Sequence, residues 1–257
     1  MESGNPPGAV QSMPFLDKLV GIFVSPGEVY ENVGGTGPTT STWFVPWLLY
    51  VTISIFTGQL LLGNPSLSSQ LEDTIRKQFD EVMQEPILKG DVTQGEADEQ
   101  FERFGSPGSP WFTLLSIGGT LFGSILSLFA ISLFCLLLAK SAMNASAPYM
   151  KVVEVVGLTF LIDALEQLVT TALMFLTDSI LASTGAALFL LPDIDLHNKW
   201  HVAISKLNTF TFWKIGILCT GLSKLFHRDF PKILVLVLAL WLLWSLFSLF
   251  TGFSPAG

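Results

Sequence analysis

This chain of 257 residues is half hydrophobic and only 13% charged, and it contains 21 phenylalanines and 7 tryptophans. A soluble core of this size needs far less apolar surface, so the composition excludes an ordinary soluble domain and predicts a protein of the lipid bilayer. The net charge of −8 comes mostly from residues 63–110. Because it arises from one segment, this charge argues neither for nor against nucleic-acid binding. We expect the partners to be lipid or another membrane protein, and no nucleic acid.

The first 42 residues are expected to precede the membrane. Residues 1–14 are predicted to be a disordered tail, and residues 15–42 a cytoplasmic interfacial helix with an elbow. Ser25, Pro26 and Glu28 have the spacing of a capping box with proline at the first helical position, and this second helix is expected to end at Gly34 and Gly35. The elbow is interpreted as a structural anchor. The alternative is a docking surface for a partner, built from Phe15, Ser25, Pro26, Glu28 and Tyr30.

Five apolar stretches are long enough to span a hydrocarbon layer, which takes about 20 helical residues. They are residues 43–62, 111–139, 152–176, 207–226 and 233–250. A sixth apolar run, 179–192, is too short and is interpreted as an extension of the third span or an interfacial segment. We therefore predict an all-α integral membrane protein, in which residues 43–253 form a five-transmembrane-helix bundle.

The loop between the first two spans, residues 63–110, is acidic, with ten acids against four bases. An external amphipathic helix is predicted over 67–85, because apolar side chains line one face and charges the other. Pro86 is expected to end this helix, and the rest of the loop is interpreted as a partly ordered linker.

Orientation follows from the basic residues in the short loops. Lys140 and Lys151 flank the loop between spans two and three, and Lys224, Arg228 and Lys232 surround the loop between the last two spans. Both loops are placed on the inner side. The N-terminus is then cytoplasmic and the C-terminus lies outside.

The third span carries the polar residues Asp163, Glu166 and Gln167, and the fourth span carries Lys214. Ionised and unpaired carboxyl groups are costly inside a bilayer, so they should face the bundle interior, be protonated or meet a cation. We expect Glu166 to pair with Lys214 and to fix the packing of the two spans. The competing interpretation is an ion or proton path through this intramembrane polar cluster.

Gly119 and Gly123 in the second span form a GxxxG motif. Small residues at this spacing let another helix approach closely. The motif indicates helix packing, either within the chain or across a homodimer.

Metal and catalytic chemistry have weak support. Weak metal-ligand candidates occur between the third and fourth spans: Asp193, Asp195, His197 and His201. A zincin motif needs glutamate directly after the first histidine, where this chain has Asn198. No P-loop, Gly-x-Ser-x-Gly or paired-cysteine motif is present, so we expect no metal, no cofactor and no enzymatic activity.

Two sequence segments carry a family resemblance. They are Ser-Pro-Gly-Glu-Val-Tyr at 25–30 and LNTFTFWKIGILCTGL at 207–222, the latter containing Phe210, Trp213 and Gly221. With the Trp/Pro entry into the first of five spans, the chain resembles the bacterial branch of the Yip1 family from about residue 15 to residue 250. The resemblance implies a five-helix bundle with a cytoplasmic N-terminus in the bacterial inner membrane.

Eukaryotic members of that family act in Golgi and ER traffic through Rab-type GTPases, but their Asp-Leu-Tyr-Gly-Pro-type motif is absent here. The expected function is therefore a non-enzymatic membrane protein that organises the bilayer or a membrane-protein partner. The alternative is a small transporter or channel component that uses Asp163, Glu166 and Lys214.

Overall fold

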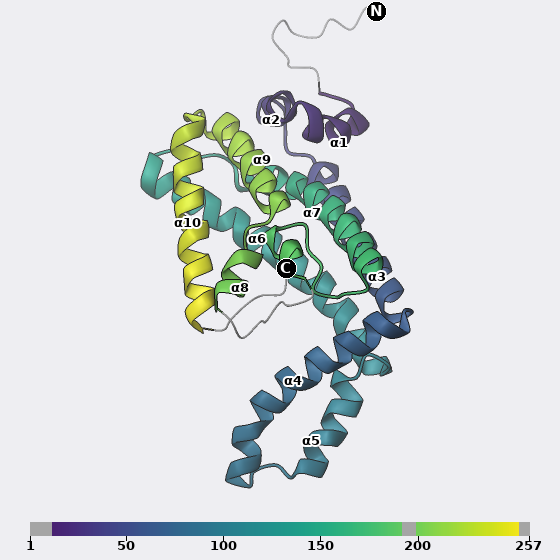
Figure 1. Cartoon of the computed structure of the whole chain (residues 1–257). Helices are drawn as coiled ribbons and strands as arrows, with labels where there is room; N and C mark the ends of the chain where they lie inside the picture. Colours follow the sequence, from purple (N-terminus) through teal and green to yellow (C-terminus); the bar gives the residue numbers. More distant parts are fainter. Residues whose placement is uncertain (1–11, 192–198, 252–257) are drawn as a thin grey trace, which may run out of the picture.

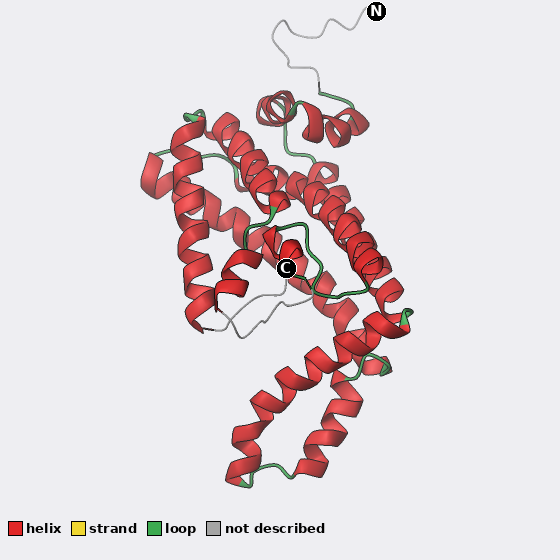
Figure 2. Ribbon diagram, viewed as in Figure 1, coloured by secondary structure: helices red, strands yellow, loops and turns green. Residues whose placement is uncertain are grey.

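The computed structural model describes residues 12–191 and 199–251. Within these two ranges the chain is helical and has no strand beyond one isolated bridge between Gly185 and Asn208, as Figure 2 shows. The prediction of an all-helical protein is confirmed. Residues 1–11 of the expected tail lie outside the described ranges.

The helices in chain order are α1 (Phe15–Val24), α2 (Pro26–Gly35), α3 (Thr40–Leu62), α4 (Pro65–Lys89), α5 (Gln94–Gln100), the π-helical turn η1 (Phe101–Gly105), α6 (Pro110–Met143), α7 (Tyr149–Thr177), the 3-10 turn η2 (Ala186–Leu190), α8 (Lys199–Ser205), α9 (Thr209–Phe226) and α10 (Phe230–Thr251). Each of the five predicted spans coincides with one helix: α3, α6, α7, α9 and α10. Among the described residues, α3 and α6 are long and apolar enough to cross a membrane, and α10 contributes a shorter apolar stretch.

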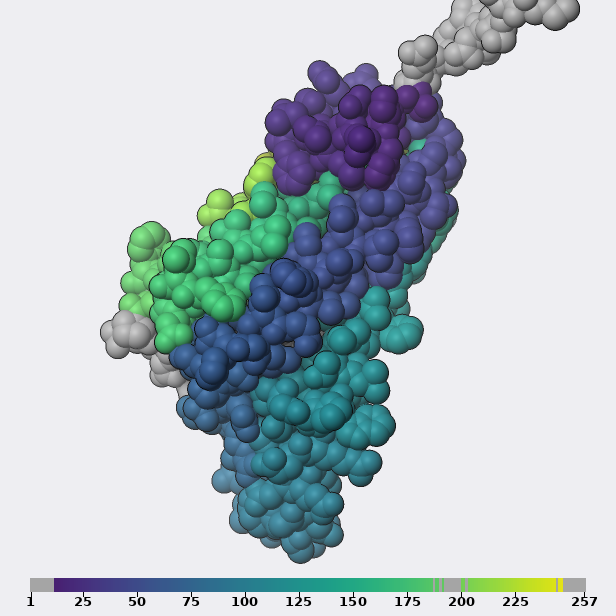
Figure 3. Space-filling model, turned by 90° about the vertical axis from the view of Figure 1, so that its right-hand side faces the viewer, coloured from purple at the N-terminus to yellow at the C-terminus, as the bar shows by residue number. Residues whose placement is uncertain are grey.

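The core is centred on α7, whose residues 151–162 are all buried. This part of α7 is apolar on nearly every side, which is the pattern of a helix surrounded by protein. Its most extensive contact is with α3, and Gly157 makes that contact possible. A Cβ atom at Gly157 would lie 2.4 Å from Cβ and 2.7 Å from Cα of Trp43. The two helices form a continuous surface in Figure 3, while α6 and α9 also pack against α7 and α10 packs against α9.

Helices α4 and α5 form a hairpin that extends away from the bundle (Figure 1). Asn64 begins α4 by accepting hydrogen bonds from the backbone of Ser66 and Leu67 at 3.0 and 3.2 Å. The expected end at Pro86 is wrong, because α4 continues through the proline to Lys89. Only one turn follows, and Gly90 ends it at φ 76°, with the Asp91 N–H bonding to the Pro86 carbonyl at 3.0 Å.

Residues 94–105 of the expected partly ordered linker are helical, so the expectation is wrong for that stretch. Thr93 and Glu96 form a reciprocal capping box at the start of α5. Arg76 of α4 pairs with Asp98 and lies 4.5 Å from the centre of the Phe101 ring. These contacts join the two arms of the hairpin, and their partners are separated by more than 20 residues in the sequence, so local composition gives no sign of them.

The segment after α7 turns back toward α9. Asp178 adopts a left-handed conformation at φ 49° and ends α7, so the expected extension of this helix through 179–192 is wrong. The Ser66 hydroxyl bonds to the Asp178 carboxylate at 2.9 Å, and Gln70 donates to the Asp178 carbonyl at 2.8 Å. The base of the α4 hairpin is therefore fixed to the end of α7.

Candidate functional site

The N-terminal elbow, defined here as α1 and α2, bends at Ser25. The Ser25 N–H bonds to the Gly21 carbonyl at 2.7 Å and ends α1, and Pro26 begins α2 at its first position. The expected capping box is wrong, because the Ser25 side chain makes no capping hydrogen bond. Close packing fixes the bend instead: a Cβ atom at Gly21 would lie 2.6 Å from Cγ2 of Val29.

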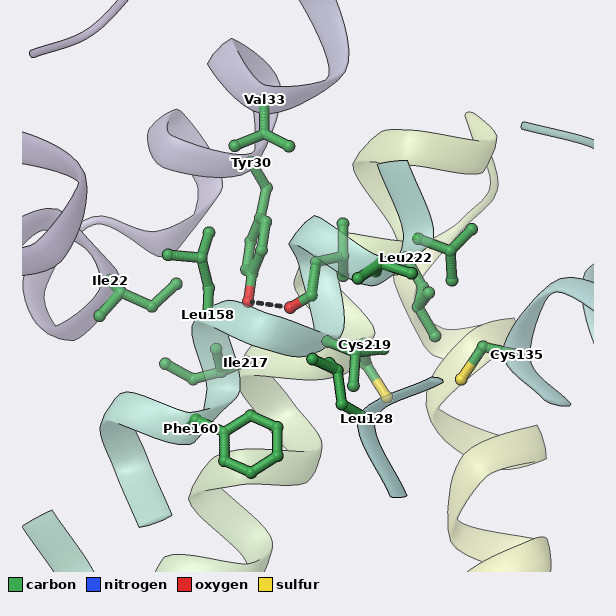
Figure 4. Packing of buried hydrophobic residues seen from close by; sticks show 14 of the residues in the cluster. Ile22, Tyr30, Val33, Leu128, Cys135, Leu158, Phe160, Ile217, Cys219 and Leu222 are labelled. Atoms are coloured by element: carbon green, nitrogen blue, oxygen red, sulfur yellow. Dashed lines mark hydrogen bonds between the residues drawn. The ribbon is translucent and has the colours of Figure 1, made fainter. Parts of the chain in front are cut away.

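Tyr30 fastens α2 to the bundle. Its hydroxyl donates a 3.2 Å hydrogen bond to the Val155 carbonyl of α7, drawn as a dashed line in Figure 4. Its ring lies against Gly221 of α9, where a Cβ atom would come within 2.9 Å of the ring. Burial raises the pKa of Tyr30 above its ordinary value, so the phenol stays protonated and remains a donor.

Two further contacts connect the elbow to α9. The ring of Phe23 lies 6.0 Å from the ring of Trp213 in an edge-on arrangement. Lys224 pairs with Glu31 at 2.9 Å, and this hydrogen bond and the charge of Lys224 hold the pKa of Glu31 below its ordinary value. The Trp213 and Gly221 positions that carry the family resemblance therefore both touch the elbow.

A buried ion pair lies where the elbow leads into α3. Lys151 and Glu154 of α7 are 2.8 Å apart, with only 5% and 1% of their side chains exposed. Lys151 also donates to the carbonyls of Val33 and Gly37 at 2.7 and 2.9 Å, and Glu154 accepts from the Thr39 N–H. The pair thus holds the backbone on both sides of the α2–α3 connection.

The sequence alone does not predict this ion pair, because Lys151 falls in an expected loop and Glu154 in the expected third span. Their i, i+3 spacing at a helix start was the available signal. Lys18 of α1 is also buried nearby, and burial, partly offset by the charge of Glu154, lowers the pKa of Lys18. Each of the two helices of the elbow therefore approaches this charged site.

One side of α1 remains exposed. Leu16, Val20 and Val24 are 71%, 64% and 76% exposed and recur every four residues, so they share one face, opposite the fully buried Ile22. We call these three residues the outer face of α1. Of the predicted docking residues, Glu28 is exposed and Phe15, Ser25 and Pro26 are partly exposed, whereas Tyr30 is buried and unavailable to a partner.

The polar residues of the third span pair differently from the expectation. Lys214 bonds to Asp163 at 2.8 Å rather than to Glu166, which instead accepts from the Asn208 side chain. Gln167 donates to the Thr57 hydroxyl of α3 at 3.1 Å. The expected Glu166–Lys214 pair is wrong. The side chain of Asn208, just before α9, lies against Glu166, and Lys214 lies against Asp163. The polar cluster connects α3, α7 and α9.

The GxxxG glycines lie on an exposed face of α6. Within the described residues, nothing would lie within 4 Å of a Cβ atom added at Gly119 or Gly123. The motif does not bring another described helix close, so packing across a homodimer stays a prediction.

The weak metal-ligand candidates Asp193, Asp195 and His197 lie outside the described residues, and His201 lies in α8. In the described part of the chain, no group of three histidine, cysteine or acidic side chains is arranged to hold a metal ion.

The comparisons with known proteins support a membrane family. The family model of the Yip1 domain matches residues 20–252. This range begins within α1 and includes α2 and the bundle helices α3, α6, α7, α9 and α10. Neither the comparison with curated proteins nor that with solved structures found a match.

Proposed function

Because this chain belongs to the Yip1 domain family of membrane proteins, we propose that it is a non-enzymatic organiser of membrane or protein partners in the bacterial inner membrane. The proposed protein is multi-pass. Its α3, α6, α7, α9 and α10 helices cross the bilayer, with the N-terminus in the cytoplasm and the C-terminus outside. The length and apolar character of α3 and α6 support this topology, as do the basic residues of the two inner loops.

The observation that carries the organising role is the contrast between the two sides of the elbow. Its inner side is fixed to α7 and α9 by Tyr30, Glu31 and the Lys151–Glu154 pair. Its outer face, Leu16, Val20 and Val24, is exposed although every residue in it is apolar. A rigidly held apolar ridge beside the membrane is suited to bind a partner protein or to enter the inner leaflet.

Site-specific photo-crosslinking in native membranes tests this role. A photoreactive residue replaces Leu16 or Val20, and Val82 serves as the matched control because it is equally exposed but lies on the α4 hairpin. We expect one recurrent protein adduct at Leu16 and Val20 and not at Val82. The same adducts at all three positions, or none except lipid, would contradict a protein-binding role of the outer face.

The alternative function is a small transporter or channel component. Asp163, Glu166 and Lys214 lie together in the predicted membrane region and sum to one negative charge when ionised, which a proton or cation must balance. This role predicts that Glu166→Gln abolishes proton or cation flux in proteoliposomes while leaving the fold intact. Equal and low flux in the variant and the natural protein would exclude it.

A further inference from the structure

A cavity of about 170 Å³ lies between α3, α6 and the first turns of α4, on the side away from the elbow. Leu71 of α4 covers one side of it. Gly58 helps to keep it open, because nothing lies within 4 Å of a Cβ atom added there. The volume is that of about five or six waters or a comparable length of hydrocarbon chain.

The cavity wall is mixed in character. Its polar members are Ser54 and Gln59 of α3 and Ser116 and Thr120 of α6. Ser116 and Thr120 donate their hydroxyl protons to the carbonyls one turn earlier in α6, at 2.7 and 2.9 Å, so only their lone pairs are left for a ligand. The Ser54 hydroxyl oxygen is buried and has no hydrogen-bond partner in the described part of the chain. A buried polar group of this kind costs free energy unless something bonds to it.

The chemistry of the wall restricts the occupant. None of the side chains that line the cavity is charged, so a buried phosphate or ammonium would be unpaired and costly. By helical rise, Ser54 lies about 12 Å below the end of α3, a depth that also disfavours a charged headgroup. A carbonyl oxygen can accept from Ser54, a free hydroxyl can donate to Ser116 or Thr120, and the apolar wall suits an alkyl chain.

We propose that this cavity binds the uncharged ester-and-hydroxyl portion of a neutral glycerolipid, with the acyl chains leaving between α3 and α6 into the bilayer. Diacylglycerol has the required groups: an ester carbonyl for Ser54 and one free hydroxyl for α6. This site is separate from the outer face of α1, and neither proposal depends on the other.

The test uses the full-length protein in nanodiscs with trace diacylglycerol that carries a diazirine beside its ester. Phosphatidylglycerol with the same chain is the comparison. We expect the diacylglycerol adducts to concentrate on the peptides containing Gly58 and Ser116 and to be displaced by unlabelled diacylglycerol. Equal labelling by the two lipids over all exposed membrane surfaces would overturn the proposal.

Two variants sharpen the result. Gly58→Leu fills the cavity and should lower the adduct yield about fivefold or more, whereas Gly119→Leu, on an exposed face of α6, should not. Ser54→Ala removes the donor without adding volume and should lower the yield about fivefold. Unchanged yield in Ser54→Ala together with a higher melting temperature would show that the hydroxyl has no ligand partner and would refute the lipid site.

Discussion

At the scale of single residues, the Lys151–Glu154 pair is a buried ion pair that the sequence does not predict, and we expect the loss of either charge to lower stability strongly. Replacing Lys151 with methionine would leave Glu154 buried without its cation, and we expect a loss of about 3–5 kcal/mol in the free energy of unfolding. Unfolding by SDS in mixed micelles measures this change. The double variant Lys151→Met/Glu154→Leu should lose less than the sum of the two single variants. Strict additivity would mean that the two charges do not act as a pair.

The Glu31–Lys224 contact predicts a pH dependence. The pKa of Glu31 is lowered in the folded state, so the pair stabilises the docked elbow above the unfolded pKa of about 4.5 and loses this effect as the pH falls through the lowered value. Hydrogen exchange of α2 between pH 3 and pH 6 should therefore show protection that declines on acidification in the natural protein. In Glu31→Gln this part of the decline should be absent, and an identical decline in both proteins would contradict the assignment.

The polar cluster shows what a sequence can and cannot predict at this scale. The spacing of Asp163 and Glu166 correctly predicts that both carboxylates share one face of a helix. It does not predict which residue of another helix lies opposite each of them. The segment before α9 brings Asn208 to Glu166, and the long stem of Lys214 then reaches Asp163. That arrangement depends on where residues 199–208 lie, which hydropathy does not determine.

At the scale of elements, the contact between α3 and α7 depends on Gly157. Alanine there would place its methyl group on Trp43, including a backbone atom that cannot rotate away, so we expect Gly157→Ala to destabilise the protein by about 1–3 kcal/mol. Thermal unfolding in detergent measures the loss. Gly123→Ala, which meets no neighbour, is the control and should be neutral or stabilise α6 by about 0.5–1 kcal/mol. Equal effects at the two positions would refute the close approach.

The hairpin gives a second prediction at this scale. The Thr93 hydroxyl accepts from the Glu96 N–H at 3.3 Å, and the Glu96 carboxylate accepts from the Thr93 N–H at 2.8 Å. Thr93→Ala should lower the stability of α5 by about 1 kcal/mol. Hydrogen exchange should show faster opening of α5 alone, with α7 unchanged. Faster exchange throughout the bundle would mean that α5 is not an independent local unit.

The sequence predicts the boundaries of an element where hydropathy determines them. It does not predict the boundaries that depend on packing against another element. The five apolar stretches all coincide with helices, because a helix satisfies every backbone group within one apolar segment. The region after Pro86 is acidic and then rich in glycine, serine and proline, a composition that predicts a linker. Its helix depends on Arg76 and Phe79 of α4, which bind Asp98 and Phe101 across the hairpin.

At the scale of the whole molecule, the elbow and the hairpin lie at different ends of the bundle (Figure 1). The elbow packs beside Lys151 of α7 and Lys224 of α9, whereas the hairpin carries the acidic excess of residues 63–110. From the loop charges, the sequence predicts that these two parts lie on opposite sides of a membrane, and that stays a prediction. The burial of Tyr30 could not be predicted from the sequence. A helix as short as α2 does not reveal which of its faces packs against the bundle.

The most direct test of the account is the side of the membrane on which each end lies. Single cysteines replace Val20 in the elbow or Val82 in the hairpin, both of which are exposed, in a background where the buried Cys135 and Cys219 are alanine. With an impermeant maleimide applied to intact cells, we predict labelling at Val82→Cys and none at Val20→Cys until the membrane is permeabilised. Labelling of both positions from the same side would contradict the proposed topology and, with it, a cytoplasmic outer face of α1.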